Sequence, residues 1–148
     1  MQGRESRIAR SVLYAIALSI AVFGANQLVL AHGDVTPQPV DTTGLEPLGE
    51  AWKTENPYRA NETAIKIGAS GYNQNCARCH GLEAISGGLA PDLRGLEKGQ
   101  PGDEWFLERI RHGAKKPDGA TMMPPFEGLI SQEAMWAIRS YIESRPME

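Results

Sequence analysis

Apolar residues recur at helical spacing in three separate segments of the chain. The first begins near Asn61, a good N-cap residue, and runs toward residue 75. The second begins at Asp103 as its N-cap and stops at Gly113, and the third runs from Ser131 to about Ser144. Five residues of the third segment share one apolar arc: Ala134, Met135, Ile138, Tyr141 and Ile142. No segment alternates apolar and polar residues as a strand does, so the predicted fold class is all-α.

Gly68 lies in the middle of the first predicted helix, four residues before Tyr72. A glycine there costs about 1 kcal/mol relative to alanine. We therefore expect another helix to approach closely at Gly68; the alternative is a glycine tolerated at a surface position.

The longest apolar run, from Val12 to Ala25, belongs to a leader rather than to the fold. Three arginines precede it, and Val29-Leu30-Ala31 supplies the small residues of a cleavage site. The pattern predicts that residues 1–31 are a signal peptide, cleaved after Ala31. The alternative is an uncleaved membrane anchor, but the apolar core is shorter than the ~20 residues that span a bilayer. We expect an exported, soluble protein without stable membrane insertion after cleavage.

Residues 32–60 contain many turn-forming residues and no sustained apolar period. They nevertheless carry Leu45, Leu48, Trp52 and Tyr58, which a disordered tail would seldom hold. We predict an extended N-terminal arm that packs on one domain formed by residues 61–148. Trp136 falls outside the apolar arc of the last helix, and we expect the arm to cover it; the alternative is that it faces a protein partner or a cofactor crevice.

The charge balance argues against one class of partner. The chain has 15 Lys and Arg against 18 Asp and Glu, a formal net charge of −3. Without residues 1–31 the balance is 12 against 17, a net charge of −5. An acidic chain without a basic stripe does not displace counterions from phosphates, so nucleic acid is not expected as a partner.

The pentapeptide Cys76-Ala77-Arg78-Cys79-His80 points to specific chemistry. Two thiols three positions apart, followed directly by an imidazole, form the attachment pattern of c-type haem. On one helical turn both thiols lie on the same face and reach one planar macrocycle, while His80 points toward the iron. The motif predicts one covalent haem c, held by Cys76 and Cys79, with His80 as an iron ligand.

Three other interpretations of the motif fit less well. A structural zinc site needs four Cys or His ligands, but the chain has two cysteines, and His32 and His112 are distant in sequence. A thioredoxin-like redox pair is expected near a βαβ pattern, which is not visible. A structural disulfide across so short a loop gives little entropic benefit.

A sixth iron ligand on the opposite face of the haem would decide between electron transfer and oxygen chemistry. The candidates are His112, Met122, Met123 and Met135. His112 ends the middle helix and Met135 lies on an apolar face, where a cap contact and core packing are the simpler roles. Met123 directly precedes two prolines, which make a stiff extended loop that suits a thioether ligand. We assign Met123, with Met122, His112 or an open site as alternatives.

A metal-bound imidazole usually donates its second ring N–H to a carbonyl or carboxylate. Pro91, eleven residues after His80, offers a rigid carbonyl. The alternative is an ordinary loop proline.

Over residues 61–145 these features resemble the class I c-type cytochromes. The segments that carry the resemblance are Gly68/Tyr72, Cys76–His80, Pro91-Asp92-Leu93, Met123-Pro124-Pro125-Phe126 and Trp136/Tyr141. The resemblance implies class I helices around one covalent haem. It also implies that Gly68 meets the last helix, that the Pro91 carbonyl receives the His80 ring N–H, and that Met123 is the distal ligand.

Further segments are similar to one group of periplasmic cytochromes c. They are residues 72–75, 81–84, 123–128 and 32–37. Members of this group accept electrons from quinoprotein (pyrroloquinoline quinone-dependent, PQQ) alcohol dehydrogenases, and relatives serve methanol dehydrogenases. The resemblance implies a periplasmic monohaem one-electron carrier, not an enzyme, with such a dehydrogenase as donor and a downstream cytochrome or terminal oxidase as acceptor. The alternatives are a cytochrome subunit of a permanent oxidoreductase complex, and a haem enzyme or ligand sensor with a displaceable sixth ligand.

Overall fold

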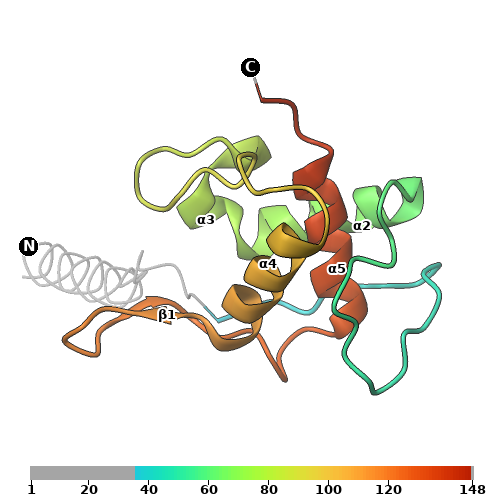
Figure 1. Cartoon of the computed structure of the whole chain (residues 1–148), viewed down its shortest axis with the longest axis horizontal. Helices are drawn as coiled ribbons and strands as arrows, with labels where there is room; N and C mark the ends of the chain where they lie inside the picture. The colour runs from blue at the N-terminus through green and yellow to red at the C-terminus, as the bar shows by residue number, and fades with distance from the viewer. Residues whose placement is uncertain (1–35, 148) are drawn as a thin grey trace, which may run out of the picture. The chain divides into compact units, whose positions relative to one another are not determined.

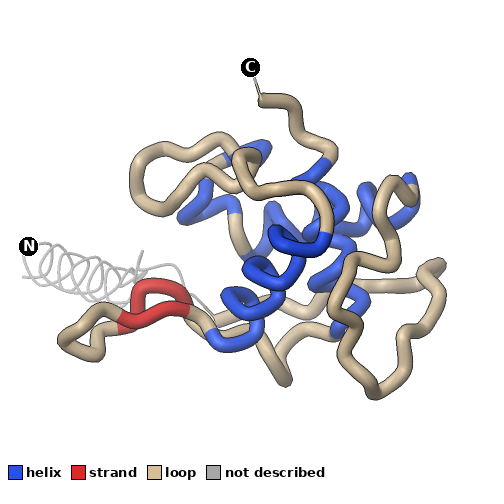
Figure 2. Tube along the Cα trace, viewed as in Figure 1, coloured by secondary structure: helices blue, strands red, loops and turns tan. Residues whose placement is uncertain are grey.

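The computed structural model describes residues 36–147. The predicted leader, the first residues of the arm and Glu148 lie outside them. The elements, in chain order, are α2 (Glu62–Asn75), α3 (Ala77–His80), η1 (Leu82–Ala84), α4 (Gln100–His112), β1 (Ala114–Lys115), β2 (Thr121–Met123) and α5 (Gln132–Glu143). Long loops connect these short elements, as the tan segments of Figure 2 show. No helix among residues 36–147 has the length and apolar character to cross a bilayer.

Two of the predicted helix starts are confirmed at the level of individual hydrogen bonds. The side chain of Asn61 accepts a hydrogen bond from the Ala64 backbone N–H at 3.0 Å, and that of Ser131 accepts one from Ala134 at 3.2 Å. Each satisfies one of the free N–H groups in the first turn of a helix. The last helix ends at Ser144, as predicted.

The predicted start of the middle helix is wrong. Helix α4 begins at Gln100 with Gly99 as its N-cap, so Asp103 lies inside the first turn and is fully buried. Its carboxylate instead accepts a hydrogen bond from Arg139 Nε at 2.8 Å. An aspartate near a helix start can act as an N-cap or as the partner of a buried cation, and the sequence does not show that an arginine from α5 faces it. The predicted end at Gly113 is confirmed.

The fold is helix-rich, but it includes a small antiparallel sheet that the all-α prediction omitted. Strands β1 and β2 pair Ala114 with Met123 and Lys115 with Thr121, with an irregularity between the two pairs. The turn closes through Asp118, whose side chain accepts the Ala120 N–H at 2.9 Å. Strands of two and three residues are too short to produce a recognisable alternation.

The expected close approach at Gly68 is confirmed. Helices α2 and α5 cross in the centre of the domain (Figure 1), and a Cβ atom at Gly68 would lie 1.9 Å from the carbonyl oxygen of Ala137. One turn further along, the rings of Tyr72 and Tyr141 pack 5.3 Å apart. The absence of a side chain at Gly68 lets the two backbones touch, which outweighs the cost of a helical glycine.

The described part of the arm packs along α5, as predicted. The Leu48 N–H donates to Glu133 Oε1 at 2.9 Å, and the Lys53 N–H donates to Gln132 Oε1 at 2.6 Å. Asn56 Nδ2 donates to Ser140 Oγ at 3.0 Å. Gln132 and Ser140 lie one turn before and one turn after Trp136 on the same helix face. The arm therefore lies along the face that carries Trp136, which is completely buried. The boundaries at residues 31 and 60 stay predictions.

A buried charge cluster joins the arm, α4 and α5. Arg59 contacts both Asp103 and Glu143, and Arg139 contacts the same two carboxylates. Arg139 and Asp103 have no exposed surface. The two arginines and two carboxylates balance in charge, so removing Asp103 or Arg139 would leave a net buried charge, which typically costs about 3–5 kcal/mol.

Candidate functional site

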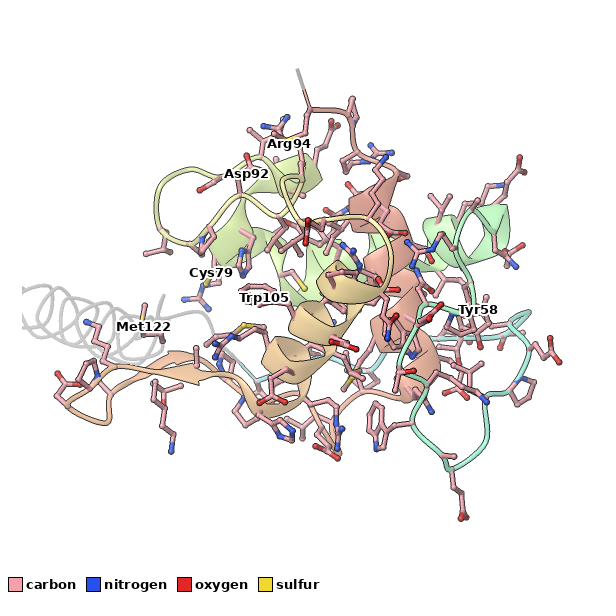
Figure 3. All side chains as sticks on the ribbon, viewed as in Figure 1. Tyr58, Cys79, Asp92, Arg94, Trp105 and Met122 are labelled. Carbon is pink, nitrogen blue, oxygen red and sulfur yellow. The ribbon has the colours of Figure 1, made fainter. Side chains whose placement is uncertain are left out.

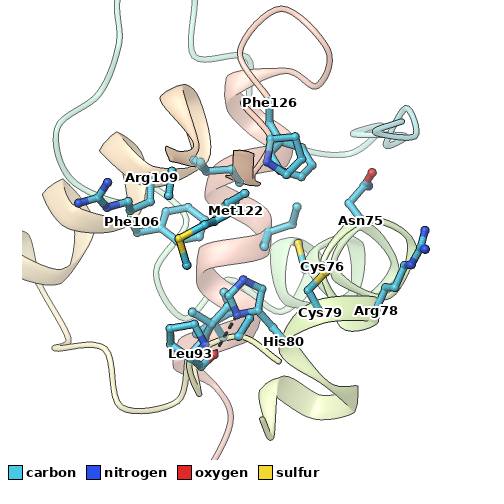
Figure 4. A pocket seen from close by; sticks show the side chains of 18 of the residues that line it. Asn75, Cys76, Arg78, Cys79, His80, Leu93, Phe106, Arg109, Met122 and Phe126 are labelled. Atoms are coloured by element: carbon cyan, nitrogen blue, oxygen red, sulfur yellow. Dashed lines mark hydrogen bonds between the residues drawn. The ribbon is translucent and has the colours of Figure 1, made fainter. Parts of the chain in front are cut away.

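The central cavity is an apolar pocket of about 250 Å³, many times the ~10–15 Å³ that one water requires. Its walls come from α3, the loop at residues 89–93, α4, the segment 122–126 and α5. Figure 4 shows Cys76, Cys79 and His80 on one side of this space, with Phe106, Met122 and Phe126 across from them. Residues predicted from separate parts of the sequence therefore line one cavity.

The two cysteines lie on one helical turn. The Cys76 N–H continues the hydrogen bonding of α2 by donating to Tyr72 O at 2.8 Å, and the His80 N–H donates to Cys76 O at 2.9 Å. Both thiols are free and both line the pocket. Burial, and to a lesser extent the neighbouring Cys79, raises the pKa of the Cys76 thiol to about 12. A catalytic redox thiol has a lowered pKa, so this environment disfavours the thioredoxin-like alternative.

The His80 ring is held by the carbonyl that the sequence singled out. His80 Nδ1 lies 2.9 Å from Pro91 O, the dashed contact in Figure 4. A carbonyl only accepts hydrogen bonds, so this contact requires the hydrogen on Nδ1 and leaves the lone pair on Nε2. A histidine with this tautomer and orientation is prepared to coordinate a metal through Nε2.

The backbone after His80 is fixed by Gly81. Tyr72 donates its hydroxyl hydrogen to Gly81 O at 2.9 Å. Gly81 has a φ of +81°, and a Cβ there would lie 1.8 Å from Ile85 O. Any other residue would strain this turn.

The loop that carries Pro91 is held by a contact that the sequence analysis did not identify. The Asp92 carboxylate accepts hydrogen bonds from Arg94 N, Nε and Nη2 at 2.9–3.1 Å and from Ser86 N at 3.2 Å. Arg94 Nη1 also donates to Pro146 O at 3.3 Å. The two side chains are labelled in the upper part of Figure 3. Chiefly through its hydrogen bond with Arg94, the pKa of Asp92 is lowered to about 2. The Asp-x-Arg spacing after Pro91 was the available signal.

The two adjacent methionines have different environments, although both line the pocket. Met122 is 64% exposed, whereas Met123 is partly buried against the core. The Met123 backbone passes so close to the end of α4 that a Cβ at Gly113 would lie 2.3 Å from Met123 O. Gly113 has a φ of +72°, so both its conformation and its lack of a side chain are required here.

Of the other two candidate ligands, Met135 has the core-packing role weighed for it, whereas His112 lies near two glutamate side chains. Met135 is completely buried in the core and does not line the pocket. His112 also lies outside the pocket lining, with its ring nitrogens 3.6 Å from Glu108 and from Glu127.

Four residues of α4 line the pocket, which the sequence did not indicate: Trp105, Phe106, Arg109 and Ile110. Phe106 contributes an apolar wall, and Arg109 lies over the Trp105 ring, 5.7 Å from its centroid. Arg78, inside the haem motif, also lines the pocket. The helical period placed these residues on a helix but gave no signal that their face borders a cavity, because that depends on how α4 packs against α3 and the segment 122–126.

This helix-rich domain, with a Cys-x-x-Cys-His turn and a methionine on one apolar pocket, is consistent with the class I c-type cytochromes. The family described as "Cytochrome C oxidase, cbb3-type, subunit III" matches residues 63–142, more than half of the chain. The chain belongs to this cytochrome c family. Membership implies haem c as the cofactor.

Individual relatives agree with this family. Cytochrome c550 of Pseudomonas aeruginosa is 58% identical over 144 residues, covering 95% of each chain. Quinohemoprotein alcohol dehydrogenase ADH IIB of Pseudomonas putida is 35% identical over 96 residues, which are 65% of this chain and 13% of that protein. The cbb3-type cytochrome c oxidase subunit FixP of Rhizobium meliloti is 36% identical over 88 residues, 55% of this chain and 30% of that subunit. This chain is a cytochrome c550-like electron-transfer protein and not an enzyme.

Proposed function

We propose that this chain is a periplasmic monohaem c-type cytochrome that carries single electrons from a PQQ-dependent alcohol or methanol dehydrogenase. A downstream cytochrome or terminal oxidase accepts them. The single observation that carries the haem assignment is the convergence of Cys76, Cys79, His80 and Met123 on one apolar cavity, with His80 Nδ1 held by Pro91 O.

The donor set fits one haem c. Cys76 and Cys79 would hold it through two thioether bonds, and His80 would coordinate the iron through Nε2. Met123 would serve as the sixth ligand, because it is the pocket methionine that is partly buried, at the end of β2 and directly before two prolines. The apolar walls suit the macrocycle, while Arg109 on the lining suits a propionate carboxylate.

A bound haem c with histidine and methionine ligands supplies one-electron chemistry without an open iron site. The residues of this chain hold it, exclude water from it and fix the tautomer of His80. The preceding residues 1–31 are proposed to direct export, which places attachment and function in the periplasm.

The likeness of almost the whole chain to a cytochrome c550 supports a separate electron carrier. The proposed donor is supported by a protein named as a quinohemoprotein alcohol dehydrogenase, which contains a segment similar to the haem domain. In those dehydrogenases the similar segment is part of a longer chain, so we propose that here a separate molecule performs the same transfer.

The haem assignment is tested on the protein expressed with the bacterial attachment machinery. We expect one haem per chain by mass, haem that acid-acetone does not extract, and a low-spin spectrum that cyanide and CO do not change. Extractable haem would disprove covalent attachment, and ready binding of CO would favour the ligand sensor.

The donor is tested by stopped-flow reduction with a purified quinoprotein alcohol dehydrogenase and its substrate. We expect reduction to saturate with dehydrogenase concentration and to weaken at high salt. Gel filtration of the mixture should show two separate proteins, because electron-transfer complexes are short-lived. Stable co-elution would favour a permanent subunit instead.

A further inference from the structure

The segment that carries Met123 is attached to the C-terminal end of α4 at successive points. The Met123 backbone passes against Gly113, and the Phe126 N–H donates to Ile110 O at 2.9 Å. One residue later, Glu127 pairs with Arg111. Arg111 Nη2 donates to Glu127 Oε1 at 2.8 Å, and Arg111 Nε donates to Oε2 at 3.2 Å. This two-bond pairing orients the guanidinium plane as well as supplying charge.

Arg111 also contacts the arm. Its guanidinium carbon lies over the Trp52 ring, 4.2 Å from the ring centroid. Trp52 is partly buried against the core, and the neighbouring Lys53 N–H is fixed to Gln132 on α5. The indole is therefore held in place from the arm side while its face supports Arg111.

Together Trp52, Arg111 and Glu127 form a continuous contact from the arm to the methionine segment, which we call the arm latch. We propose that the arm latch positions Met123: Trp52, from outside the haem domain, limits the motion of the segment that carries the distal ligand. This inference rests on the proposed role of Met123 and assigns the arm a function in ligand retention.

The physical reason is the restriction of Arg111. An arginine side chain has many rotamers, and holding one of them for a bidentate pair costs conformational entropy. The Trp52 ring removes part of that freedom in advance, so the pair with Glu127 persists. His112 Nδ1 also faces Glu127, at 3.6 Å, and the Arg111 pairing is the closer of the two.

The arm latch is tested on the holoprotein with Trp52→Ala and Arg111→Gln. The rate at which imidazole displaces Met123, followed by loss of the sulfur-to-iron absorption band, should rise about fivefold in each variant, as expected for one lost cation–π or ion-pair contact. The Trp52→Ala/Arg111→Gln double variant should be no faster than Arg111→Gln alone, because that variant already lacks the contact that Trp52→Ala removes. Trp52→Phe retains a ring face and should stay close to wild type.

Leu48→Ala is the matched control. Leu48 packs the same arm on the core but is not part of the arm latch. When its loss of melting temperature equals that of Trp52→Ala, Leu48→Ala should leave the rate of imidazole displacement within about twofold of wild type, as expected of an indirect effect. If it accelerates displacement as much as Trp52→Ala, or if Trp52→Ala has no effect, the proposal is wrong.

Amide hydrogen exchange gives a readout that does not depend on the iron. Exchange of the Phe126 N–H should accelerate in Trp52→Ala and Arg111→Gln while that of the His80 N–H stays unchanged. Absence of a sulfur-to-iron band in the wild-type protein would refute Met123 ligation itself. Normal ligation with unchanged Phe126 exchange in the variants would refute only the arm latch.

Discussion

The two sides of the pocket are built in different ways. On the His80 side, the contacts that fix the site come from nearby in the sequence: Tyr72 reaches Gly81, and Pro91 reaches His80. On the Met123 side, Gly113 and Arg111 lie at the end of α4, 10 and 16 positions before the residues that they meet. The distant partner on this side is Trp52 of the arm, more than seventy positions before Glu127.

The difference indicates where each side is vulnerable. Local contacts form as the α3 turn forms, whereas distant contacts depend on the packing of α4 and of the arm. We therefore expect conditions that loosen the packing to release the methionine while the histidine side stays intact.

Met123→Ala should remove the distal ligand and leave the His80 side unchanged. The reduction potential should fall by on the order of 0.1 V, within the ~0.8 V range that axial ligands control, because a thioether favours the reduced iron. Loss of the sulfur-to-iron band and new binding of imidazole would accompany it. Potentiometry and visible spectra measure both.

Met122→Ala is the matched control for the ligand, since Met122 is adjacent but mostly exposed. It should leave the spectrum and potential nearly unchanged. Should Met122→Ala abolish the band while Met123→Ala retains it, the two assignments must be exchanged.

Two glycine variants compare the two sides directly. Gly81→Ala and Gly113→Ala each place a Cβ against a carbonyl oxygen at positive φ, which costs roughly 1–3 kcal/mol of strain in addition to the clash. Gly113→Ala should weaken Met123 ligation and keep normal haem attachment. Gly81→Ala should lower the yield of attached haem. Mass spectrometry of attached haem and the sulfur-to-iron band measure the two effects; identical effects of both variants would contradict the separation.

The sequence predicted local features of the molecule better than contacts between distant segments. Three features were identified because each has a recognisable pattern within a few residues: the motif at 76–80, the carbonyl of Pro91 and the close approach at Gly68. The buried role of Asp103 and the short β1–β2 hairpin were not identified. The Asp92–Arg94 pair was also missed, although its partners are only two residues apart. Asp103 has its partner Arg139 in another helix, and the hairpin strands are too short to show a period. The contact between Trp52 and Arg111 forms only when distant segments pack together, so no local sequence pattern predicts it.

Asp92→Asn should loosen the His80 side through the loop that carries Pro91. Because Arg94 lowers the pKa of Asp92 to about 2, from about 3.9 in an unfolded chain, the carboxylate stabilises the folded state above about pH 4. That contribution is lost as the pH falls toward 2. The difference in melting temperature between wild type and Asp92→Asn should therefore be complete at neutral pH and shrink between about pH 4 and 2. Asp41→Asn is the control, because Asp41 also accepts a backbone N–H from a residue two positions later, and this variant should not alter the exchange of the His80 N–H. If the difference in melting temperature between wild type and Asp92→Asn did not depend on pH, the proposed effect of the Asp92 charge on stability would be contradicted.

Tyr58→Phe tests the arm at the opposite end of the pH range, with the smallest expected effect. The Tyr58 hydroxyl donates to Glu46 O within the arm, and its ring is buried. Burial, followed by the nearby charges of Glu133 and Glu46, raises the pKa of Tyr58 to about 12, compared with about 10 in an unfolded chain. The neutral phenol is thus favoured in the folded state, so its contribution is complete below about pH 10 and is lost as the pH rises toward 12.

At neutral pH the Tyr58→Phe variant should lose about 1 kcal/mol of unfolding free energy through the missing hydrogen bond. That deficit should diminish between about pH 10 and 12, measured by urea unfolding at each pH. Trp52 belongs to the same arm, so loss of the Tyr58 contact should also weaken the hold on Met123. Between about pH 10 and 12 the rate at which imidazole displaces Met123 should therefore rise more in the wild type than in Tyr58→Phe. An equal rise in both proteins would show that ionisation of Tyr58 does not affect the methionine side through the arm.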